Sequence, residues 1–232
     1  MAGAMRIARS GFTLVELMVS SLLFSLVIAA LSAIYSTAFG QSGKAFREGR
    51  VKAMALGSMK AIMKHVGESN RIDLPTRAGG GITGRHLTGC SNQAPDGARI
   101  TPSENVTRFH FCVRLTNLPP GRACDGEPDP APCMFYYTKE NASACVASDV
   151  TDANCGTATS AMGSPRFLAS GLEINAGMPA NGYFTRAPGA LLAGEANSVR
   201  MTYKVTRAPV GNGKKTIYIV DTTASGQFGV FP

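Results

Sequence analysis

The first third of the chain contains a long stretch without charge, which predicts a membrane helix. After Glu16 the next charged residue is Lys44, so residues 17–43 form an uncharged, mostly apolar run of 27. As a helix this run would be about 40 Å long, which exceeds the roughly 30 Å core of a bilayer. We therefore expect residues 12–40 to form a transmembrane helix with a basic cytoplasmic flank.

Apolar residues then recur every three or four positions, which predicts that residues 41–67 continue as an amphipathic helix. No proline occurs between Gly11 and Pro75, and Gly40 and Gly43 mark the expected point of bending or melting. The stripe expected to pack on a sheet is Val51, Ala55, Met59, Ile62, Met63 and Val66. The other faces carry the cations Lys44, Arg47, Arg50, Lys52, Lys60 and Lys64. We expect a solvated or subunit-facing surface there, with attraction to anionic lipid or DNA as the alternative.

Alternation with a period of two dominates the remainder, so residues 68–232 are expected to form a β-rich globular domain. Strands are predicted at residues 108–115, 134–138, 198–206 and 215–223, with a broken strand at 167–174. The first should place Phe109, Phe111 and Val113 on one face and His110, Cys112 and Arg114 on the other. The last two should each gather apolar residues on one face, namely Val199, Met201, Tyr203 and Val205, and Ile217 and Ile219.

The expected fold class is α+β. A long N-terminal helix, with a transmembrane half and an amphipathic half, should pack on a mostly antiparallel β-sheet domain with disulfide-stapled loops. Residues 210–214 join the last two strands and are typical of a hairpin turn. Residues 67–107 are rich in glycine, proline and polar residues, and we expect a long loop region there.

All six cysteines lie between residues 90 and 155, which indicates disulfides formed outside the cytoplasm. Six cysteines allow fifteen pairings, so the sequence alone does not determine the connectivity. Closure of short loops favours Cys124–Cys133 and Cys145–Cys155, and leaves Cys90 to pair with Cys112.

Charge is concentrated in the helical third. Residues 1–71 contain nine Lys and Arg against three Asp and Glu, whereas the rest of the chain contains fourteen against twelve. The basic balance is therefore weak evidence that the globular part binds an anionic partner.

The sequence gives no support for catalysis, and we expect neither an enzyme nor a cofactor. His65, His86 and His110 lie on separate predicted elements, and no G-x-S-x-G motif occurs. Residues 79–84 match G-x-G-x-x-G, but no predicted strand precedes them. Calcium is an alternative for the acidic groups, although they lack EF-hand spacing. These groups are Asp125, Glu127 and Asp129 in one loop and Asp149 and Asp152 in another.

The segment from Gly11 to Leu17, GFTLVEL, follows a short basic leader and precedes the apolar run. It resembles the class III signal of type IV pilins and type II secretion pseudopilins. The resemblance implies that residues 1–11 are a leader peptide, that prepilin peptidase cleaves between Gly11 and Phe12, and that Phe12 is N-methylated. It also implies that Glu16 pairs with the N-terminal amine of an adjacent subunit. The alternative role for this carboxylate is to cap its own helix.

More diffuse similarity connects the chain to PilW-like minor pilins and J-type pseudopilins. It covers an FYYT segment at 135–138, GLEINAG at 171–177 and NSVRMTYKV at 197–205. Ala33 occupies a position where many major pilins carry a proline, and removal of the leader leaves 221 residues, more than most major pilins have. These features favour a minor pilin of a type IV pilus that helps to initiate or cap the filament. A J-type pseudopilin and a tip adhesin or DNA-binding pilin remain as alternatives.

The resemblance also implies partners and a location. The partners would be other major and minor pilins, prepilin peptidase, the inner-membrane assembly platform and the membrane itself, with nucleic acid as the alternative. The chain would reside in the bacterial inner membrane before assembly and afterwards in a pilus at the cell surface.

Overall fold

The structure is a computed structural model. It describes residues 13–76, 83–93, 98–116, 124, 132–142, 144–145, 148–180, 182–186, 198–208 and 214–226. The chain divides into two compact units, residues 1–46 and 47–232, and each is described by itself.

Helix α1 spans Leu14–Gly67 and supplies the described part of the first unit. Every described residue up to Phe46 is exposed, including the large apolar side chains from Leu14 to Phe39. The helix continues through Gly40 and Gly43, so the expected melting at these glycines does not occur. Neither glycine has an atom within 4 Å of the position that a β-carbon would occupy.

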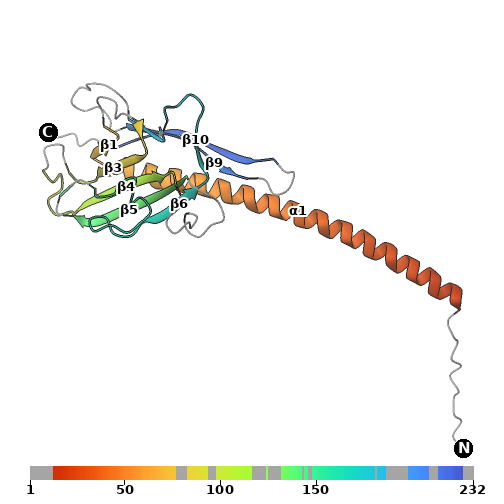
Figure 1. The fold of residues 1–232 in the computed structure, drawn as a ribbon. Coiled ribbons are helices and arrows are strands. Elements are labelled where there is room, and N and C mark those ends of the chain that lie inside the picture. Colours follow the sequence, from red (N-terminus) through yellow and green to blue (C-terminus); the bar gives the residue numbers. More distant parts are fainter. Residues whose placement is uncertain are drawn as a thin grey trace, which may run out of the picture. The chain divides into compact units, whose positions relative to one another are not determined.

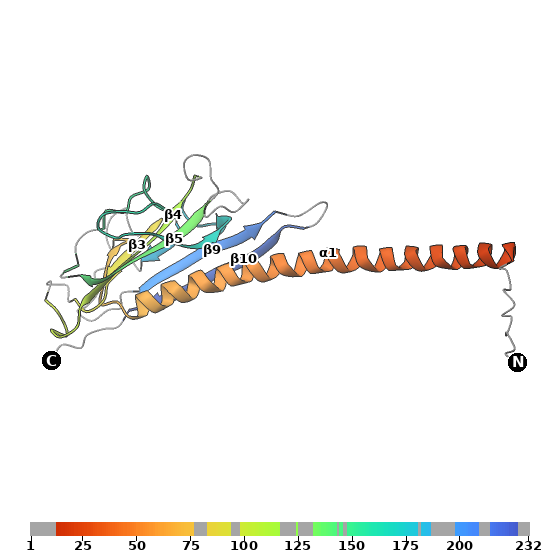
Figure 2. The same ribbon diagram turned by 90° about the horizontal axis from the view of Figure 1, so that it is seen from below.

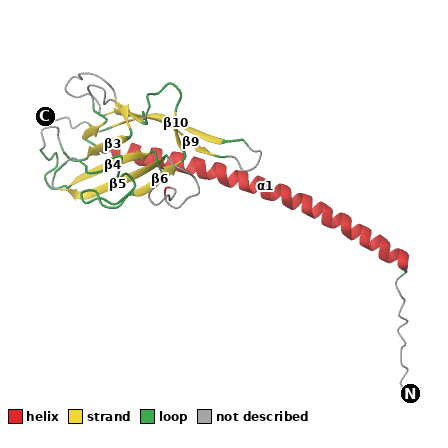
Figure 3. Ribbon diagram, in the orientation of Figure 1, coloured by secondary structure: helices red, strands yellow, loops and turns green. Residues whose placement is uncertain are grey.

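The second unit combines the remainder of α1 with two antiparallel sheets (Figures 1 and 3). The first sheet has the order β1-β3-β4-β5-β6, and its strands are Arg71–Leu74, His86–Cys90, Val106–Arg114, Cys133–Ala142 and Arg166–Ser170. The second has the order β10-β9-β8-β2, with β7 also paired to β9. Its strands are Thr216–Ser225, Ser198–Arg207, Phe184–Arg186, Thr83–Gly84 and Leu172–Ile174. The predicted broken strand at 167–174 thus divides between the two sheets, as β6 and β7.

One hydrophobic cluster joins α1 to the inner faces of both sheets. The residues that α1 buries are Val51, Met54, Ala55, Ser58, Ile62 and Val66. The predicted stripe was wrong at Met63, which is 42% exposed, and Met59 is only partly buried. Met54 and Ser58 lie in the stripe instead, because positions four residues apart, such as 54, 58 and 62, share one helix face. Figure 2 shows the C-terminal part of α1 running alongside β9 and β10.

Strands β4 and β9 confirm the predicted alternation. Phe109, Phe111 and Val113 lie in the core cluster, whereas Cys112 belongs to a second cluster on the other face of the sheet. In β10, Ile217 and Ile219 share a face as expected, but it is the solvent face: they are 51% and 58% exposed. The buried positions of this strand are Val220 and Ala224.

The disulfides only partly follow the expectation from short loops. Cys124 pairs with Cys133, as predicted. The other two predicted pairs were wrong, because Cys90 bonds to Cys145 and Cys112 bonds to Cys155. The register of β3 and β4 explains why: Cys90 lies opposite Arg108 and Cys112 lies opposite His86, so the two cysteines are four positions out of step.

A buried hydroxyl pair links α1 to the second sheet. The hydroxyl groups of Ser58 and Tyr203 are 2.7 Å apart, and Ser58 also donates to the carbonyl oxygen of Ala55. Burial raises the pKa of Tyr203 to about 12, so its hydroxyl remains a donor.

We expect Ser58→Ala to lower the free energy of unfolding by about 1–3 kcal/mol, because it leaves the buried Tyr203 hydroxyl without its partner. In a Tyr203→Phe background the same change should cost clearly less. Denaturant titration of the four proteins of this cycle measures the coupling. Equal costs in both backgrounds would contradict a stabilising contact.

Removal of Cys112–Cys155 should cost more stability than removal of Cys124–Cys133. The paired residues are 43 positions apart in the first and 9 in the second. Loop entropy then gives costs of about 4 and about 2.5 kcal/mol. Denaturant titration of the two double-alanine variants tests the order, and non-reducing peptide mapping tests the connectivity. A peptide joining Cys145 to Cys155 would disprove the pairing described above.

Candidate functional site

The first turn of α1 is closed by a capping box. The hydroxyl oxygen of Thr13 accepts the Glu16 backbone N–H at 3.3 Å, and Glu16 Oε2 accepts the Thr13 backbone N–H at 3.0 Å. The Thr13 hydroxyl also donates to Oε2 at 3.0 Å. Two backbone donors that the helix itself cannot satisfy therefore find partners, as the T-x-x-E pattern allows. The sequence contained this signal, and the alternative capping role of Glu16 is present in the structure.

Capping occupies only half of the Glu16 carboxylate. All of its hydrogen bonds to described residues use Oε2, and Oε1 has no partner among them. An ionised carboxylate has about four lone-pair sites, so capping leaves acceptor capacity on the outer oxygen. The side chain is exposed, which makes that oxygen accessible to a donor from another molecule.

Hydroxyl side chains along the apolar part of α1 are satisfied within the helix. Ser25 donates to Ser21 O, Ser32 to Ile28 O and Thr37 to Ala33 O, at 2.8–2.9 Å. Ser20 makes the same kind of bond to Glu16 O. Backbone and side-chain polar groups must find partners when a helix leaves water, so these bonds reduce the cost of an apolar environment. Sequence reasoning had treated these positions only as uncharged.

Among the described residues, α1 is the helix that is long and apolar enough to cross a membrane, and it lies near the N-terminus. Gly11 and Phe12, the expected cleavage and methylation positions, lie outside the described residues.

Comparison with known families identifies this part of the chain. Residues 6–32 match the family described as the prokaryotic N-terminal methylation motif. This match supports the type IV pilin and pseudopilin class. It implies processing by prepilin peptidase and assembly with other pilins, and with the apolar helix it fits a membrane-anchored pilin. Neither the curated proteins nor the solved structures contain a match to the chain.

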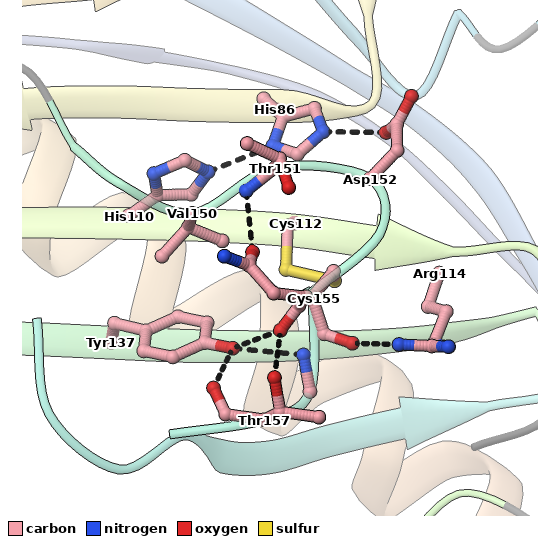
Figure 4. Close-up of a disulfide and its surroundings, with 12 residues drawn as sticks. His86, His110, Cys112, Arg114, Tyr137, Val150, Thr151, Asp152, Cys155 and Thr157 are labelled. Atoms are coloured by element: carbon pink, nitrogen blue, oxygen red, sulfur yellow. Dashed lines mark hydrogen bonds and ion pairs between the residues drawn. A yellow bond between two sulfur atoms is a disulfide. The ribbon is translucent and has the colours of Figure 1, made fainter. Parts of the chain in front are cut away.

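The Cys112–Cys155 disulfide lies at the centre of a second cluster of polar groups, which sequence reasoning missed (Figure 4). It ties residues 148–165 to the outer face of the first sheet, over Phe135 and Tyr137. The Tyr137 hydroxyl accepts the Gly156 N–H at 2.8 Å and donates to Thr157 O at 2.9 Å. Arg114 donates to the carbonyl oxygen of Cys155 at 2.8 Å.

Two histidines extend this cluster into a chain of hydrogen bonds. His86 Nε2 is 2.7 Å from Asp152 Oδ1, and His86 Nδ1 is 2.8 Å from His110 Nε2. His110 Nδ1 is 2.7 Å from the Ser148 hydroxyl and 3.1 Å from that of Thr88. The chain joins β3 and β4 to the segment at 148–152, so it fastens that segment to the sheet. The sequence places these histidines on separate predicted elements, and no signal in it pairs them.

Burial lowers the pKa of His110 to about 3, and the neighbouring His86 adds to this shift. Arg108 lowers the pKa further, whereas the carboxylate of Asp149 opposes the shift. The buried imidazole is therefore neutral at ordinary pH. It carries one proton and can act as donor at one nitrogen and acceptor at the other, as the chain of hydrogen bonds requires.

The acidic groups considered for calcium are only partly described. Asp125, Glu127 and Asp129 lie outside the described residues. Asp149 accepts the Ala161 N–H at 2.9 Å, and Asp152 is engaged by Arg85 and His86. Among the described residues, one set of potential ligand atoms for a metal comes close together, that of Asp73, Cys90 and Cys145. Its two sulfur atoms are bonded to each other, so they do not offer thiolates.

We expect acid to destabilise the domain through His110. Its pKa is lower in the folded chain than the ordinary value of 6.5, so the unfolded chain binds more protons between pH 6.5 and about 3. As the pH is lowered from 6.5 to about 3, the free energy of unfolding should therefore decrease by up to about 1.4 kcal/mol for each pH unit. His110→Asn should flatten the profile. His65, whose pKa burial also lowers, remains in both proteins, so their difference isolates His110. Parallel profiles from pH 7 to 4 would contradict this account.

Proposed function

We propose that the chain is a minor pilin, a subunit that helps to initiate or cap a type IV pilus. The observation that carries the proposal is the first turn of α1. There, a carboxylate within the methylation motif caps its own helix with one oxygen and keeps the other available. The exposed apolar surface of α1 that follows needs lipid or other helices to cover it.

The proposed assembly step begins with cleavage between Gly11 and Phe12. This frees an amine at Phe12, which is then methylated and remains a cation. In the filament, the amine of one subunit meets Glu16 of its neighbour, where Oε1 accepts a charge-assisted hydrogen bond. Because surrounding apolar helices exclude water, a Glu16 without its partner would be costly, by about 3–5 kcal/mol. That cost would favour the register in which every subunit is paired.

Several features favour a minor subunit over a major one. Ala33 lies within an unbroken helix, without the proline that many major pilins carry there, and the 221 residues that remain after cleavage exceed the length of most major pilins. The three disulfides that staple the globular part favour the pilus over the pseudopilin, because such staples suit a protein exposed outside the cell. The pilus at the cell surface is therefore the proposed destination, after storage in the inner membrane and delivery by the assembly platform.

A J-type pseudopilin of a type II secretion system shares the N-terminal motif and is the second candidate. The two differ in the filament that the chain enters. Co-purification of the tagged full chain with sheared pili would favour the pilus. Loss of protein secretion with normal pili, on deletion of the gene, would favour the pseudopilin. A DNA-binding tip subunit would co-purify with sheared pili and would in addition bind DNA in a salt-sensitive manner.

Glu16→Gln provides a sharp test of the pairing. Glutamine can still close the capping box, so this change removes the charge and retains the helix start. We expect normal membrane insertion and cleavage but loss of at least about 90% of the chain from filaments. Even a pairing energy of about 1.4 kcal/mol corresponds to a tenfold change in the equilibrium constant for incorporation. Immunoblots of sheared filaments and of membranes measure the fraction of the chain in each.

Thr13→Ala is the matched control. It removes the Thr13 hydroxyl from the capping box but retains the Glu16 carboxylate and its bond from the backbone N–H of residue 13, so the helix start should lose about 1 kcal/mol while incorporation persists. If Glu16→Gln enters filaments normally, the proposed ion pair does not direct assembly. If Thr13→Ala fails as completely as Glu16→Gln, capping rather than pairing is the requirement.

A further inference from the structure

Strand β10 forms a long, regular edge of the second sheet. It pairs with β9 through ten consecutive residue pairs, from Thr216 opposite Arg207 to Ser225 opposite Ser198. This ladder has no shift of register, whereas those of β1–β3, β4–β5 and β5–β6 each contain one. The other strands at sheet edges are shorter: β1 has four residues, β6 has five, β7 has three and β2 has two. In the part of the chain that the structure describes, β10 pairs with β9 alone.

The first half of this edge lacks the features that usually prevent pairing. Natural edge strands are protected by charges, prolines, bulges or short length. Residues 216–220, TIYIV, contain no charge and no proline and are strongly β-forming. Their outward row exposes Ile217 and Ile219 by about half. An apolar row beside free backbone groups is a template for another strand.

Charges bracket these isoleucines in a self-complementary order. The same outward row has Lys215 on one side of the pair and Asp221 on the other. Each already has a partner within the sheet, Glu173 for the lysine and Arg200 for the aspartate. The row therefore runs from cation through two isoleucines to anion, and a copy running in the opposite direction presents the complementary order.

We propose that β10 is a homophilic docking edge, where a second copy of this chain adds its own β10 antiparallel to the first. The favoured register places Tyr218 opposite Tyr218 of the second copy. Ile217 then lies opposite Ile219 of the second copy, and Lys215 opposite Asp221. Shifting the register by two residues would place Ile219 opposite itself and Ile217 opposite Asp221, which loses both the apolar and the charge match.

Such a contact is isologous, because the same strand contributes from both copies. It closes on itself and gives a dimer, unlike the head-to-tail contacts that extend a filament. The inference rests on the sheet edge alone and requires neither cleavage nor Glu16, so it can fail while the proposed function holds, and the reverse.

Site-directed cross-linking tests both the contact and its register. All six native cysteines are in disulfides, so Ile217→Cys and Ile219→Cys each introduce one free thiol. Full-length chains carrying tags of different size would be mixed in detergent micelles and mildly oxidised. Opposed residues are about 4.5–5.5 Å apart between Cα atoms, within disulfide range. We expect mixed Ile217→Cys and Ile219→Cys chains to form a heterodimer at least about tenfold more than either chain alone, since like positions lie beyond about 7 Å.

Thr223→Cys mixed with Ile217→Cys is the matched control, because these positions share the exposed row but do not face each other in this register. Absence of the mixed cross-link would overturn the proposal. Self-cross-linking of Ile219→Cys to the same extent would overturn it as well, because that product belongs to the shifted register.

A second variant separates this edge from association through α1 in the micelle. Ile219→Lys places an ammonium group in the proposed apolar contact, and we expect dimer dissociation to become at least about tenfold more favourable in sedimentation measurements. Because Ile219 is exposed, the near-UV circular dichroism should not change. Thr223→Lys, on the same row, should leave dimerisation unchanged. Equal dimerisation of the Ile219→Lys and native chains would overturn the proposal.

Discussion

The apolar surface of α1 from Leu14 to Phe39 is the constraint on which the rest of the molecule depends. These side chains are exposed, and a surface of this extent is not stable against water in a monomer. Lipid can cover it, and so can the helices of other subunits. A chain that must exchange one cover for the other needs polar groups that fit both environments, and the hydroxyl groups of α1 meet this need by bonding to the helix's own carbonyls.

The second half of the same helix packs against the globular unit instead of requiring lipid or other subunits. From Val51 to Val66 it buries one stripe against two sheets, and the Ser58–Tyr203 pair is enclosed within that contact. Both sheets use one face for this core. The outer face of the first sheet is covered by the segment at 148–165, which Cys112–Cys155 and the histidine chain fasten in place. The globular unit therefore has two layers of packing on one sheet, and the second depends more on covalent and polar links than on apolar area.

The parts of this structure that the sequence predicts are those with a short repeat or a local motif. The stripe on α1 and the alternation in β4 and β9 follow from periodicity, and helix capping was the alternative role expected for Glu16. The predictions were wrong where they depended on how segments distant in the sequence meet in the fold. Cys112 lies near His86 in register but bonds to Cys155, because the outer face of the sheet, rather than loop length, decides its partner. Ile217 and Ile219 illustrate the same limit: alternation shows that they share a face but not which face contacts the core.

The capping box at Thr13 has an electrostatic consequence for the mature chain. Cleavage after Gly11 would leave a positively charged amine one residue ahead of the N-cap, next to the positive end of the helix macrodipole. That end attracts anions and repels cations, so each newly trimmed chain would carry an unfavourable charge at its own tip. Contact with an acidic group on another chain would relieve this repulsion. Polymerisation would then be favoured by an electrostatic repulsion that proteolysis itself creates. The uncleaved precursor would lack this repulsion, because its residue 12 has no free amine.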